Sequence, residues 1–188
     1  IARDMTETQR TQEKHDELMK NLVRTLMRTV DQHDPYCAGH SERTAQVAVA
    51  IGRELNLDDD ALDQLELAAS LANVGKLLIP KEILTKTAPL SEQEVNTLRQ
   101  HVQSARDILG GLDFEGPVME IIFQKHEHID GSGYPRGLRG DQMLPEGRIL
   151  AVANTFVAMV SARAYRPGLP VKDALNNLLA PGSSEQYD

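Results

Sequence analysis

The sequence is poor in three things: cysteine, positive charge and long apolar runs. Cys37 is the single cysteine, so no disulfide can form within the chain, and a reducing, cytoplasmic setting is expected. Lysine and arginine number 20 against 28 aspartate and glutamate, giving a net charge of -8. That balance argues against binding DNA or RNA, which depends on a basic surface. No apolar run approaches the roughly 20 residues that a membrane-spanning helix needs, so we expect no membrane segment.

What remains is the composition of a globular domain, with 40% hydrophobic and 26% charged residues. A chain of 188 residues is long enough to form its own core. Apolar residues recur at helical spacing, and no stretch alternates as a strand does. The sequence therefore predicts an all-α fold. Helices are expected over residues 8–30, 42–55, 58–74, 91–109, 115–125, 146–164 and 171–179.

Capping residues locate three helix starts. Ser41 and Asp58 each stand before an apolar-periodic stretch, where a side-chain oxygen can accept a hydrogen bond from the first turn. Ser91 is followed three residues later by Glu94, which is the capping-box pattern. We therefore expect Ser41, Asp58 and Ser91 to be N-caps.

The first predicted helix carries a narrow apolar stripe on a polar surface, with Leu18, Leu22 and Leu26 among its members. Such a stripe is typical of a dimeric signalling coiled coil, and it also fits a helix that packs on its own domain. The sequence leaves both alternatives open. Residues 1–30 are expected to form a signalling linker helix through which the chain makes a homodimer, and residues 31–188 to form the domain.

The first ten residues, Ile1–Arg10, resemble the closing segment of a PAS sensor domain, where such a segment leads into a linker helix. The chain also begins without a methionine. We therefore expect it to be part of a longer protein in which a PAS-type sensor comes first.

Two stretches carry the motifs of the chain. Leu71–Pro80 reads Leu-Ala-Asn-Val-Gly-Lys-Leu-Leu-Ile-Pro, and Phe123–Gly140 joins a histidine-bearing helix to a loop containing Asp-Gly-Ser-Gly-Tyr-Pro. Both resemble the HD-GYP domains, bacterial cyclic di-GMP phosphodiesterases of the HD superfamily of metal-dependent phosphohydrolases. The resemblance runs from about Asp34 to Arg166. It implies a bacterial signalling protein with an HD-type bundle of about seven helices, preceded by the linker helix.

The resemblance also implies which residues would surround metal ions. Active members use two or three iron or manganese ions, and two-metal phosphodiesterases hold their ions about 3.5–4 Å apart. Carried over position by position, the histidines that are kept are His40, His101 and His126. The ligand positions that have changed are Ala72, Asn73, Lys125 and Asn154.

These changes remove both carboxylates and introduce a positive charge at Lys125, where a dication would lie. Like charges at short range in a poorly solvated pocket repel one another strongly. The resemblance therefore implies a degenerate HD-GYP domain that holds no metal, does not hydrolyse cyclic di-GMP and acts by binding a nucleotide or a protein. Lys125 and Asn154 would then hydrogen-bond the remaining histidines.

One alternative keeps catalysis. Three histidines can hold a single zinc ion with an open position, as in some hydrolytic sites, and Glu127 or His128 could supply a fourth ligand. That arrangement would be a metal-dependent phosphodiesterase with a rebuilt site. In the plainer alternative, the histidines are neutral and hydrogen-bonded within the pocket.

Three basic residues match ligand-binding positions of the family. Lys76 corresponds to the lysine thought to act on the scissile phosphate, and it could hold a phosphate without cleaving it. Arg163 and Arg166, in Arg-Ala-Tyr-Arg, resemble an Arg-Pro-Tyr-Arg segment whose basic residues contact the phosphates of the dinucleotide. Alternatively, both arginines are surface residues near a helix C-terminus, where the helix dipole favours cations.

The glycine loop is nearly complete, with Gly131, Gly133, Tyr134 and Pro135 at its motif positions. Glycine lets the backbone take positive φ values that other residues avoid. In the family this loop lies beside the active site, and in some members it has been linked to docking of diguanylate cyclase (GGDEF) domains. The sequence leaves open a docking surface, a loop packed on the helical core, or both.

Overall fold

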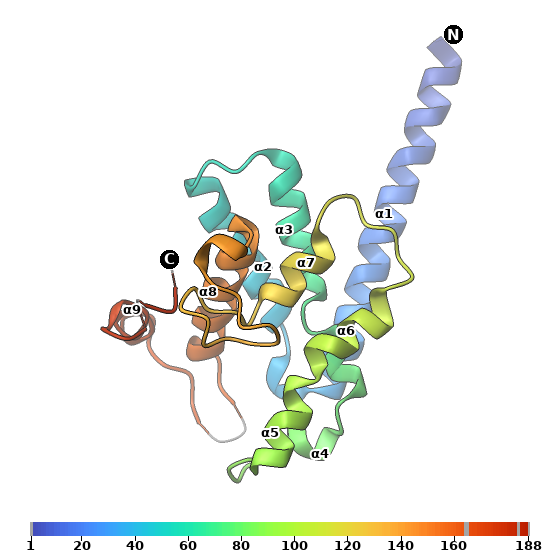
Figure 1. Ribbon diagram of the computed structural model, residues 1–188. Helices are drawn as coiled ribbons and strands as arrows, with labels where there is room; N and C mark the ends of the chain where they lie inside the picture. Colours follow the sequence, from blue (N-terminus) through green and yellow to red (C-terminus); the bar gives the residue numbers. More distant parts are fainter. Residues whose placement is uncertain (1, 164–165, 184, 188) are drawn as a thin grey trace.

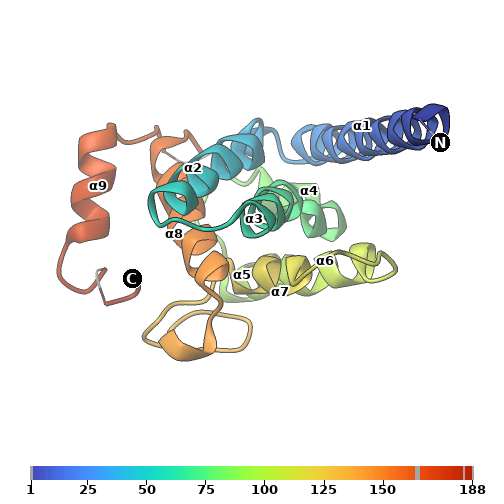
Figure 2. The ribbon, with the colours of Figure 1, turned by 90° about the horizontal axis from the view of Figure 1, so that it is seen from above.

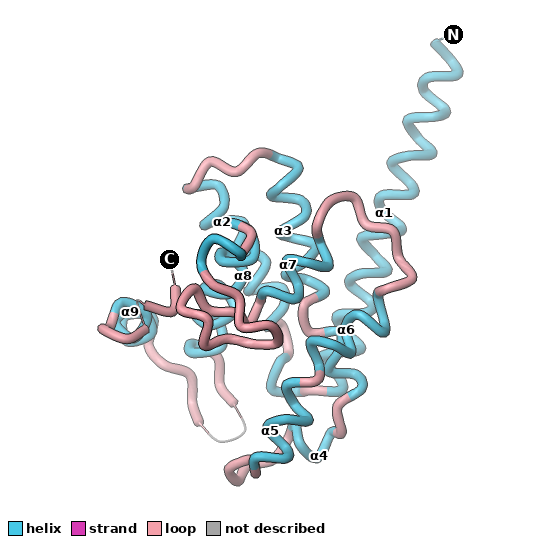
Figure 3. The backbone as a smooth tube through the Cα atoms, in the orientation of Figure 1, coloured by secondary structure: helices cyan, strands magenta, loops and turns pink. Residues whose placement is uncertain are grey.

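The computed structural model describes residues 2–163, 166–183 and 185–187. Over these residues the chain is all-α, as predicted, with no β-strand and two isolated bridges, Asp130–Arg139 and Arg163–Arg166. Figure 1 shows the helices gathered into one body from which the first helix projects, and Figure 3 shows the loops that join them. None of the described helices is long and apolar enough to cross a membrane.

The elements follow one another along the chain with mostly short connections. The α-helices are α1 (Ala2–His33), α2 (His40–Glu54), α3 (Asp59–Leu71), α4 (Lys81–Leu84), α5 (Glu92–Arg99), α6 (His101–Leu109), α7 (Val118–Gln124), α8 (Pro145–Val160) and α9 (Val171–Leu179). The 3-10 helices are η1 (Pro35–Cys37), η2 (Val74–Leu78) and η3 (Gly140–Gln142).

The core lies among α2, α3, α7 and α8, which pack on one another. Leu65 of α3, Ile121 of α7 and Leu150 of α8 are fully buried there. Burying an aliphatic side chain of this size contributes about 1.5–3 kcal/mol. Seen from above, α8 lies between α9 and α3, so its two faces join the outer helix to the core (Figure 2).

A second contact, between α6 and η2, positions the residues of the predicted site. Gly75 approaches α6 so closely that a β-carbon there would lie 1.8 Å from the carbonyl oxygen of His101. A side chain has no room at that distance, so the approach requires glycine. It brings η2, with Asn73 before it and Lys76 within it, against the first turn of α6.

The C-terminal half of α1 belongs to the domain, because Val30 is buried in the core and Val23 and Leu26 pack against it. The N-terminal half projects away from the other helices (Figures 1 and 2). Leu18 and Leu22, near the middle of the helix, are 57% and 54% exposed. The apolar stripe is thus divided between the core and solvent, and the predicted dimer and the domain boundary at residue 30 stay predictions.

Two of the predicted N-caps are confirmed. The Asp58 side chain accepts a hydrogen bond from the backbone N–H of Ala61 at 2.9 Å, at the start of α3. Ser91 and Glu94 form the expected capping box at the start of α5.

The prediction that Ser41 caps its helix is wrong. Helix α2 begins two residues earlier than expected, at His40, and its N-cap is Gly39, which has a positive φ of 66°. Ser41 lies inside the helix, and its hydroxyl accepts a hydrogen bond from the side-chain amide of Asn73 at 3.1 Å. A contact with a residue distant in sequence therefore replaces the local cap.

The single helix predicted over residues 91–109 is also wrong, because the chain forms α5 and α6 with a break at Gln100. The backbone N–H of Gln100 bonds to Thr97 at 3.1 Å, which is the spacing of a 3-10 turn. This turn starts α6 at His101 and buries that side chain. Other helix ends differ from expectation by a few residues, as boundaries commonly do.

Candidate functional site

A cavity of about 750 Å³ is lined by η1, the first residues of α2 and α6, η2, the α4–α5 region and the C-terminal half of α8. The predicted site residues that line it are His40, Asn73, Lys76, His101, His126, Tyr134, Asn154, Arg163 and Arg166. Ala72 and Lys125 are buried and contact this group through hydrogen bonds. The fold therefore gathers residues from distant parts of the chain at one place.

His40, at the first residue of α2, is 2% exposed, and its Nε2 lies 3.0 Å from Oδ1 of Asn154. An amide oxygen only accepts, so Nε2 of His40 carries the hydrogen. Burial lowers the pKa of His40 to about 3; the bond to Asn154 opposes this, and the positive charge of Arg163 adds to it. His40 is therefore a neutral imidazole whose Nε2 donates to the asparagine that stands at a lost ligand position.

Lys125, just after α7, is the most unusual residue of the site, because its charged side chain is only 2% exposed. Its Nζ donates to the carbonyl oxygen of Ala72 at 2.6 Å and to Oδ1 of Asn73 at 3.1 Å, and lies 3.3 Å from Nε2 of His101. Three acceptors thus match the three hydrogens of an ammonium. Burial, followed by the positive charge of Lys76, lowers the pKa of Lys125 to about 7.

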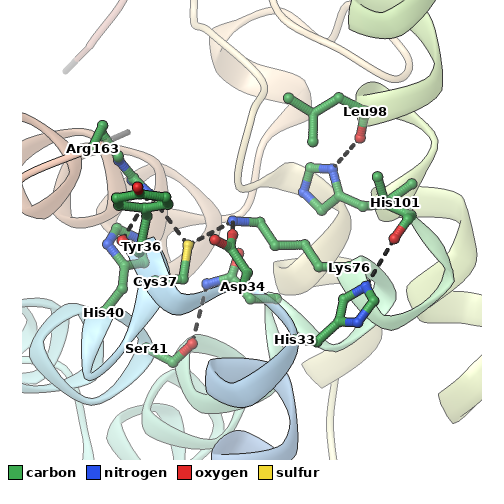
Figure 4. Close-up of polar contacts among 12 residues, drawn as sticks. His33, Asp34, Tyr36, Cys37, His40, Ser41, Lys76, Leu98, His101 and Arg163 are labelled. Carbon is green, nitrogen blue, oxygen red and sulfur yellow. Dashed lines mark hydrogen bonds and ion pairs between the residues drawn. The ribbon is translucent and has the colours of Figure 1, made fainter. Parts of the chain in front are cut away.

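His101 and His126 meet edge to face, with their rings 5.2 Å apart. Nδ1 of His101 donates to the carbonyl oxygen of Leu98 at 2.7 Å (Figure 4), so its Nε2 is the acceptor. Lys125 Nζ and His126 Nε2 both lie 3.3 Å from that nitrogen. Burial, and then the positive charge of Lys125, lowers the pKa of both histidines, which are therefore neutral.

These contacts decide whether a metal ion fits. A dication takes a lone pair from each imidazole, but Nε2 of His40 donates to Asn154 and Nε2 of His101 faces the ammonium of Lys125. Across the described ranges, no three or more His, Cys, Asp or Glu side chains are grouped so as to hold a metal ion. The residues present fit neither a two-metal centre nor a single zinc ion on the three histidines.

Lys76 reaches the cavity from η2, where its Nζ lies 2.9 Å from Oδ2 of Asp34 and 2.7 Å from Sγ of Cys37 (Figure 4). Burial alone would lower the pKa of Lys76, but the interactions with Cys37 and Asp34 outweigh it and raise the pKa. Lys76 is therefore a charged donor at the cavity. The sequence prediction missed Asp34 and did not connect Cys37 with Lys76; no local pattern joins positions so far apart.

The two predicted phosphate-binding arginines differ in their contacts. Arg163 donates to Sγ of Cys37 at 3.2 Å, beside Lys76 in the cavity lining. Arg166 donates instead to the carbonyl oxygens of Ala158 and Met159 near the end of α8, at 2.8 and 3.1 Å. Those bonds satisfy the open end of the helix, which agrees with the alternative interpretation for Arg166. Tyr165, between the two arginines, lies outside the described residues.

The glycine loop is held by a carboxylate that the sequence interpretation had offered as a metal ligand. Glu127 is fully buried, and its two oxygens accept the backbone N–H groups of Arg136 and Leu138 at 2.7 and 2.9 Å. Both carboxylate oxygens of Glu127 are therefore engaged in hydrogen bonds to the loop. Gly133 of the loop packs closely against Glu127, since a β-carbon at Gly133 would lie 2.4 Å from the Cα of Glu127.

Tyr134 joins the loop to the histidines. Its ring stacks on His126 at 4.7 Å with an interplanar angle of 11°, and its backbone N–H donates to the carbonyl oxygen of His126 at 2.9 Å. The guanidinium of Arg99 lies 5.1 Å from the ring centroid. Burial raises the pKa of Tyr134 to about 12. Gly131 and Pro135 flank this contact in the loop, and any docking role for them stays a prediction.

A bundle of α-helices in which separate helices bring histidines to one cavity is typical of an HD-type helical domain. The chain belongs to the HD domain family, whose sequence pattern matches residues 24–188. The expected resemblance is thereby confirmed, although nothing tests the predicted PAS-type domain upstream.

Known relatives agree with this membership. The chain is 34% identical over 167 residues to the "Cyclic di-GMP phosphodiesterase response regulator RpfG" of Xanthomonas campestris, covering 88% of this chain and 44% of that protein. It is 35% identical over 160 residues to "3'3'-cGAMP-specific phosphodiesterase 3" of Vibrio cholerae, covering 85% of this chain and 35% of that protein. The chain thus spans less than half the length of these relatives.

The fold is similar to that of a solved HDG"Y"P protein, Bd1817, from Bdellovibrio bacteriovorus. The TM-score is 0.66 at 22% identity, and the match covers 79% of this chain and 47% of that chain. At this identity the likeness concerns the fold alone.

Proposed function

We propose that this chain is a signalling domain of the HD-GYP type that binds a cyclic dinucleotide without hydrolysing it. The observation that carries the proposal is the placement of Lys125, whose Nζ is bonded to Ala72 and Asn73 and faces His101. Two-metal hydrolysis needs cations that activate a water and neutralise the phosphate. One buried ammonium supplies charge but no metal-bound hydroxide.

The proposed ligand follows from the relatives and the cavity together. Relatives are named for cyclic di-GMP and for 3'3'-cGAMP, which share a ring of two phosphodiesters. The cavity is large enough for such a molecule, since ligand pockets commonly span about 300–1,000 Å³. Lys76 and Arg163 line it with donors suited to phosphate oxygens.

We propose further that residues 1–30 pass the state of an upstream PAS-type sensor to this domain in a cytoplasmic protein. Leu18 and Leu22, exposed near the middle of α1, would pair with the same residues of a second copy. The glycine loop around Tyr134 would offer a docking surface to a partner protein such as a diguanylate cyclase domain. Both roles require binding and no turnover.

Three measurements on the purified chain test the proposal. Elemental analysis after loading with iron, manganese or zinc is expected to find no bound metal. Incubation with cyclic di-GMP in the presence of iron or manganese is expected to leave it intact, while calorimetry with the same ligand is expected to show binding. Metal-dependent turnover would overturn the lack of hydrolysis, and a flat titration would overturn nucleotide binding.

A reverted variant provides the positive control. It combines Ala72→His, Asn73→Asp, Lys125→His and Asn154→Asp, which restore the ligands that the resemblance implies. We expect this variant to bind metal when the parent does not, because it adds two carboxylates and two imidazoles and removes the ammonium. The single substitution Lys125→Met is the matched control, since it removes the ammonium without adding a ligand.

A further inference from the structure

The cavity that holds the histidines is chemically divided. One part carries polar and charged groups already described, including Lys76 with its partner Asp34, and Arg163. Another part is formed by the α4–α5 region, whose lining residues are apolar except for Lys86 and Thr87. We call this second part the apolar wall; its residues are Ile83, Leu84, Ala88, Pro89, Leu90 and Leu98.

The apolar wall adjoins the histidines directly. The carbonyl oxygen of Leu98 accepts the hydrogen bond from Nδ1 of His101, and Leu98 itself lines the cavity. Figure 4 shows Leu98 and His101 together on one side of the view and Tyr36 and Arg163 on the other, with Lys76 between them. A ligand that filled the cavity would therefore meet cations and carbon surface at the same time.

The connection between α4 and α5 is fixed in shape before any ligand arrives. Glu94 accepts the backbone N–H of Ser91 at 2.7 Å and the ammonium of Lys86 at 2.6 and 2.8 Å. Residues 88–90 are thus held between two points anchored to one carboxylate. The same bonds pair the charge of Lys86, which also lines the cavity, so the wall presents little free charge. A preformed surface costs less conformational entropy on binding.

The charge pattern indicates what occupies the wall. A phosphate on this carbon surface would lose its hydration without compensation, so phosphates belong at the end with Lys76 and Arg163. The part of a ligand that lies on the apolar wall must therefore be uncharged and flat, as the faces of nucleobases are. Tyr134 is not free to stack on a base, because His126 and Arg99 already lie against its ring.

The relatives add an independent reason. At 34% and 35% identity, they are named for cyclic di-GMP and for 3'3'-cGAMP, which have the same phosphodiester ring and differ in one base. Residues that hold phosphates do not distinguish these ligands. Discrimination between them must come from residues that contact the bases.

We propose that the apolar wall binds the nucleobases of a cyclic purine dinucleotide and that Leu90, which has the largest side chain of the anchored segment 88–90, is a specificity-determining residue of this site. The inference rests on the proposed function, since it takes the phosphates to lie at Lys76 and Arg163. It goes beyond that function by assigning the choice of base to the α4–α5 connection, which carries none of the family's metal or phosphate positions.

The test uses the full chain with three probes: cyclic di-GMP, 3'3'-cGAMP and inorganic pyrophosphate, which lacks bases. Leu90→Asn is expected to weaken both dinucleotides by about tenfold, because a hydrophobic contact in a binding pocket is lost, and to leave pyrophosphate binding unchanged. Lys76→Met is expected to weaken all three. Leu90→Phe is expected to change the ratio of the two dinucleotide affinities.

Leu112→Asn is the matched control, since Leu112 is 54% exposed in the α6–α7 connection and is not among the residues that line the cavity. It is expected to bind all three probes as the parent does. Should Leu90→Asn prove unstable, Leu90→Ala tests the same contact, with a smaller loss expected.

The outcomes separate the two proposals. If the parent binds no dinucleotide, both fail. If the parent binds and the Leu90 variants match it in affinity and base preference, the wall proposal alone is overturned. Parallel loss of pyrophosphate and dinucleotide binding in a folded Leu90 variant also overturns it, because the residue would then act on the phosphates.

Discussion

Among single residues, Lys125 changes the chemistry of the cavity most. Its ammonium is bonded to a backbone carbonyl and an amide oxygen and lies against an imidazole, all of them neutral groups. No carboxylate is among these partners and burial lowers the pKa of Lys125 to about 7, so its positive charge, present in part at neutral pH, is held by dipoles alone. A buried charge held in this way depends on every partner, because an unpaired charge in a protein interior is strongly unfavourable. The surrounding side chains are thereby fixed in orientation.

The first prediction concerns the loss of stability at acidic pH. Burial lowers the pKa of His40 to about 3 from an ordinary value of 6.5. The unfolded chain therefore binds a proton at higher pH than the folded one, and stability falls as the pH drops below 6.5. From pH 7 to pH 5 this residue should cost about 2 kcal/mol of unfolding free energy.

Urea unfolding at the two pH values, with His40→Gln beside the parent, measures this contribution. The variant cannot titrate at that position, so its stability should fall less between the two pH values. The buried His101 and His126 remain in both proteins and add an equal loss in the same direction, because their pKa values are also lowered. An equal fall in parent and variant would contradict the prediction.

The second prediction concerns the glycine loop. A β-carbon at Gly133 would lie 2.4 Å from Cα of Glu127 and 2.4 Å from the backbone nitrogen of His128. Backbone atoms cannot rotate away, so Gly133→Ala should destabilise the domain by about 1–3 kcal/mol or displace the loop. Gly111→Ala is the control, because nothing lies within 4 Å of a β-carbon there. Thermal unfolding compares the two, and equal midpoints would refute the argument.

For single residues, the sequence predicts which residues form the site better than it predicts the contacts that they make. The resemblance to HD-GYP domains was enough to bring His40, Lys125 and Asn154 into one hypothesis. It gave no sign that Glu127 holds the loop through the N–H groups of Arg136 and Leu138, because that role depends on where the loop folds back. A buried carboxylate beside two histidines looks like a ligand until the loop is placed.

A helix end could be predicted where the residues that fix it are close in sequence, and could not be predicted where they are distant. The capping box of Ser91 and Glu94 was predictable because both partners lie within one turn. The start of α2 was not, because Gly39 turns the chain and Asn73 engages the hydroxyl of Ser41. The break at Gln100 follows from packing of α6 on η2 through Gly75, and no proline or glycine marks it.

The third prediction belongs to α1. Leu18→Glu with Leu22→Glu should abolish concentration-dependent dimerisation and leave the domain folded, because both residues are exposed near the middle of the helix. Charges at a coiled-coil seam oppose pairing. Lys20→Glu, two residues along from Leu18 and therefore near the opposite side of the helix, is the control. Leu26 is unsuitable, since it packs on the core.

Sedimentation equilibrium over a range of concentrations distinguishes the outcomes for α1. The parent and Lys20→Glu should both associate, and the double variant should remain a monomer with an unchanged unfolding temperature. A parent that stays monomeric at high concentration would contradict the proposed dimer and leave the projecting half of α1 without that role.

For the molecule as a whole, the fourth prediction concerns chelators. A tightly bound metal would stabilise the folded state by about 2.7 kcal/mol at a hundredfold excess over its Kd. With Lys125 bonded among the former ligand positions, we expect the melting temperature to be the same with EDTA as with iron, manganese or zinc. The fourfold reverted variant should melt higher with metal than with EDTA. A metal-dependent shift in the parent would contradict the proposal.

The contact of Lys125 with His101 has one more consequence, for the cell in which the protein works. An iron or manganese ion must be acquired, and ferrous iron is lost when oxygen oxidises it. A lysine is made with the polypeptide and stays with it. The contact between Lys125 and His101 therefore forms when the chain folds, and it depends neither on the supply of metal ions nor on their oxidation.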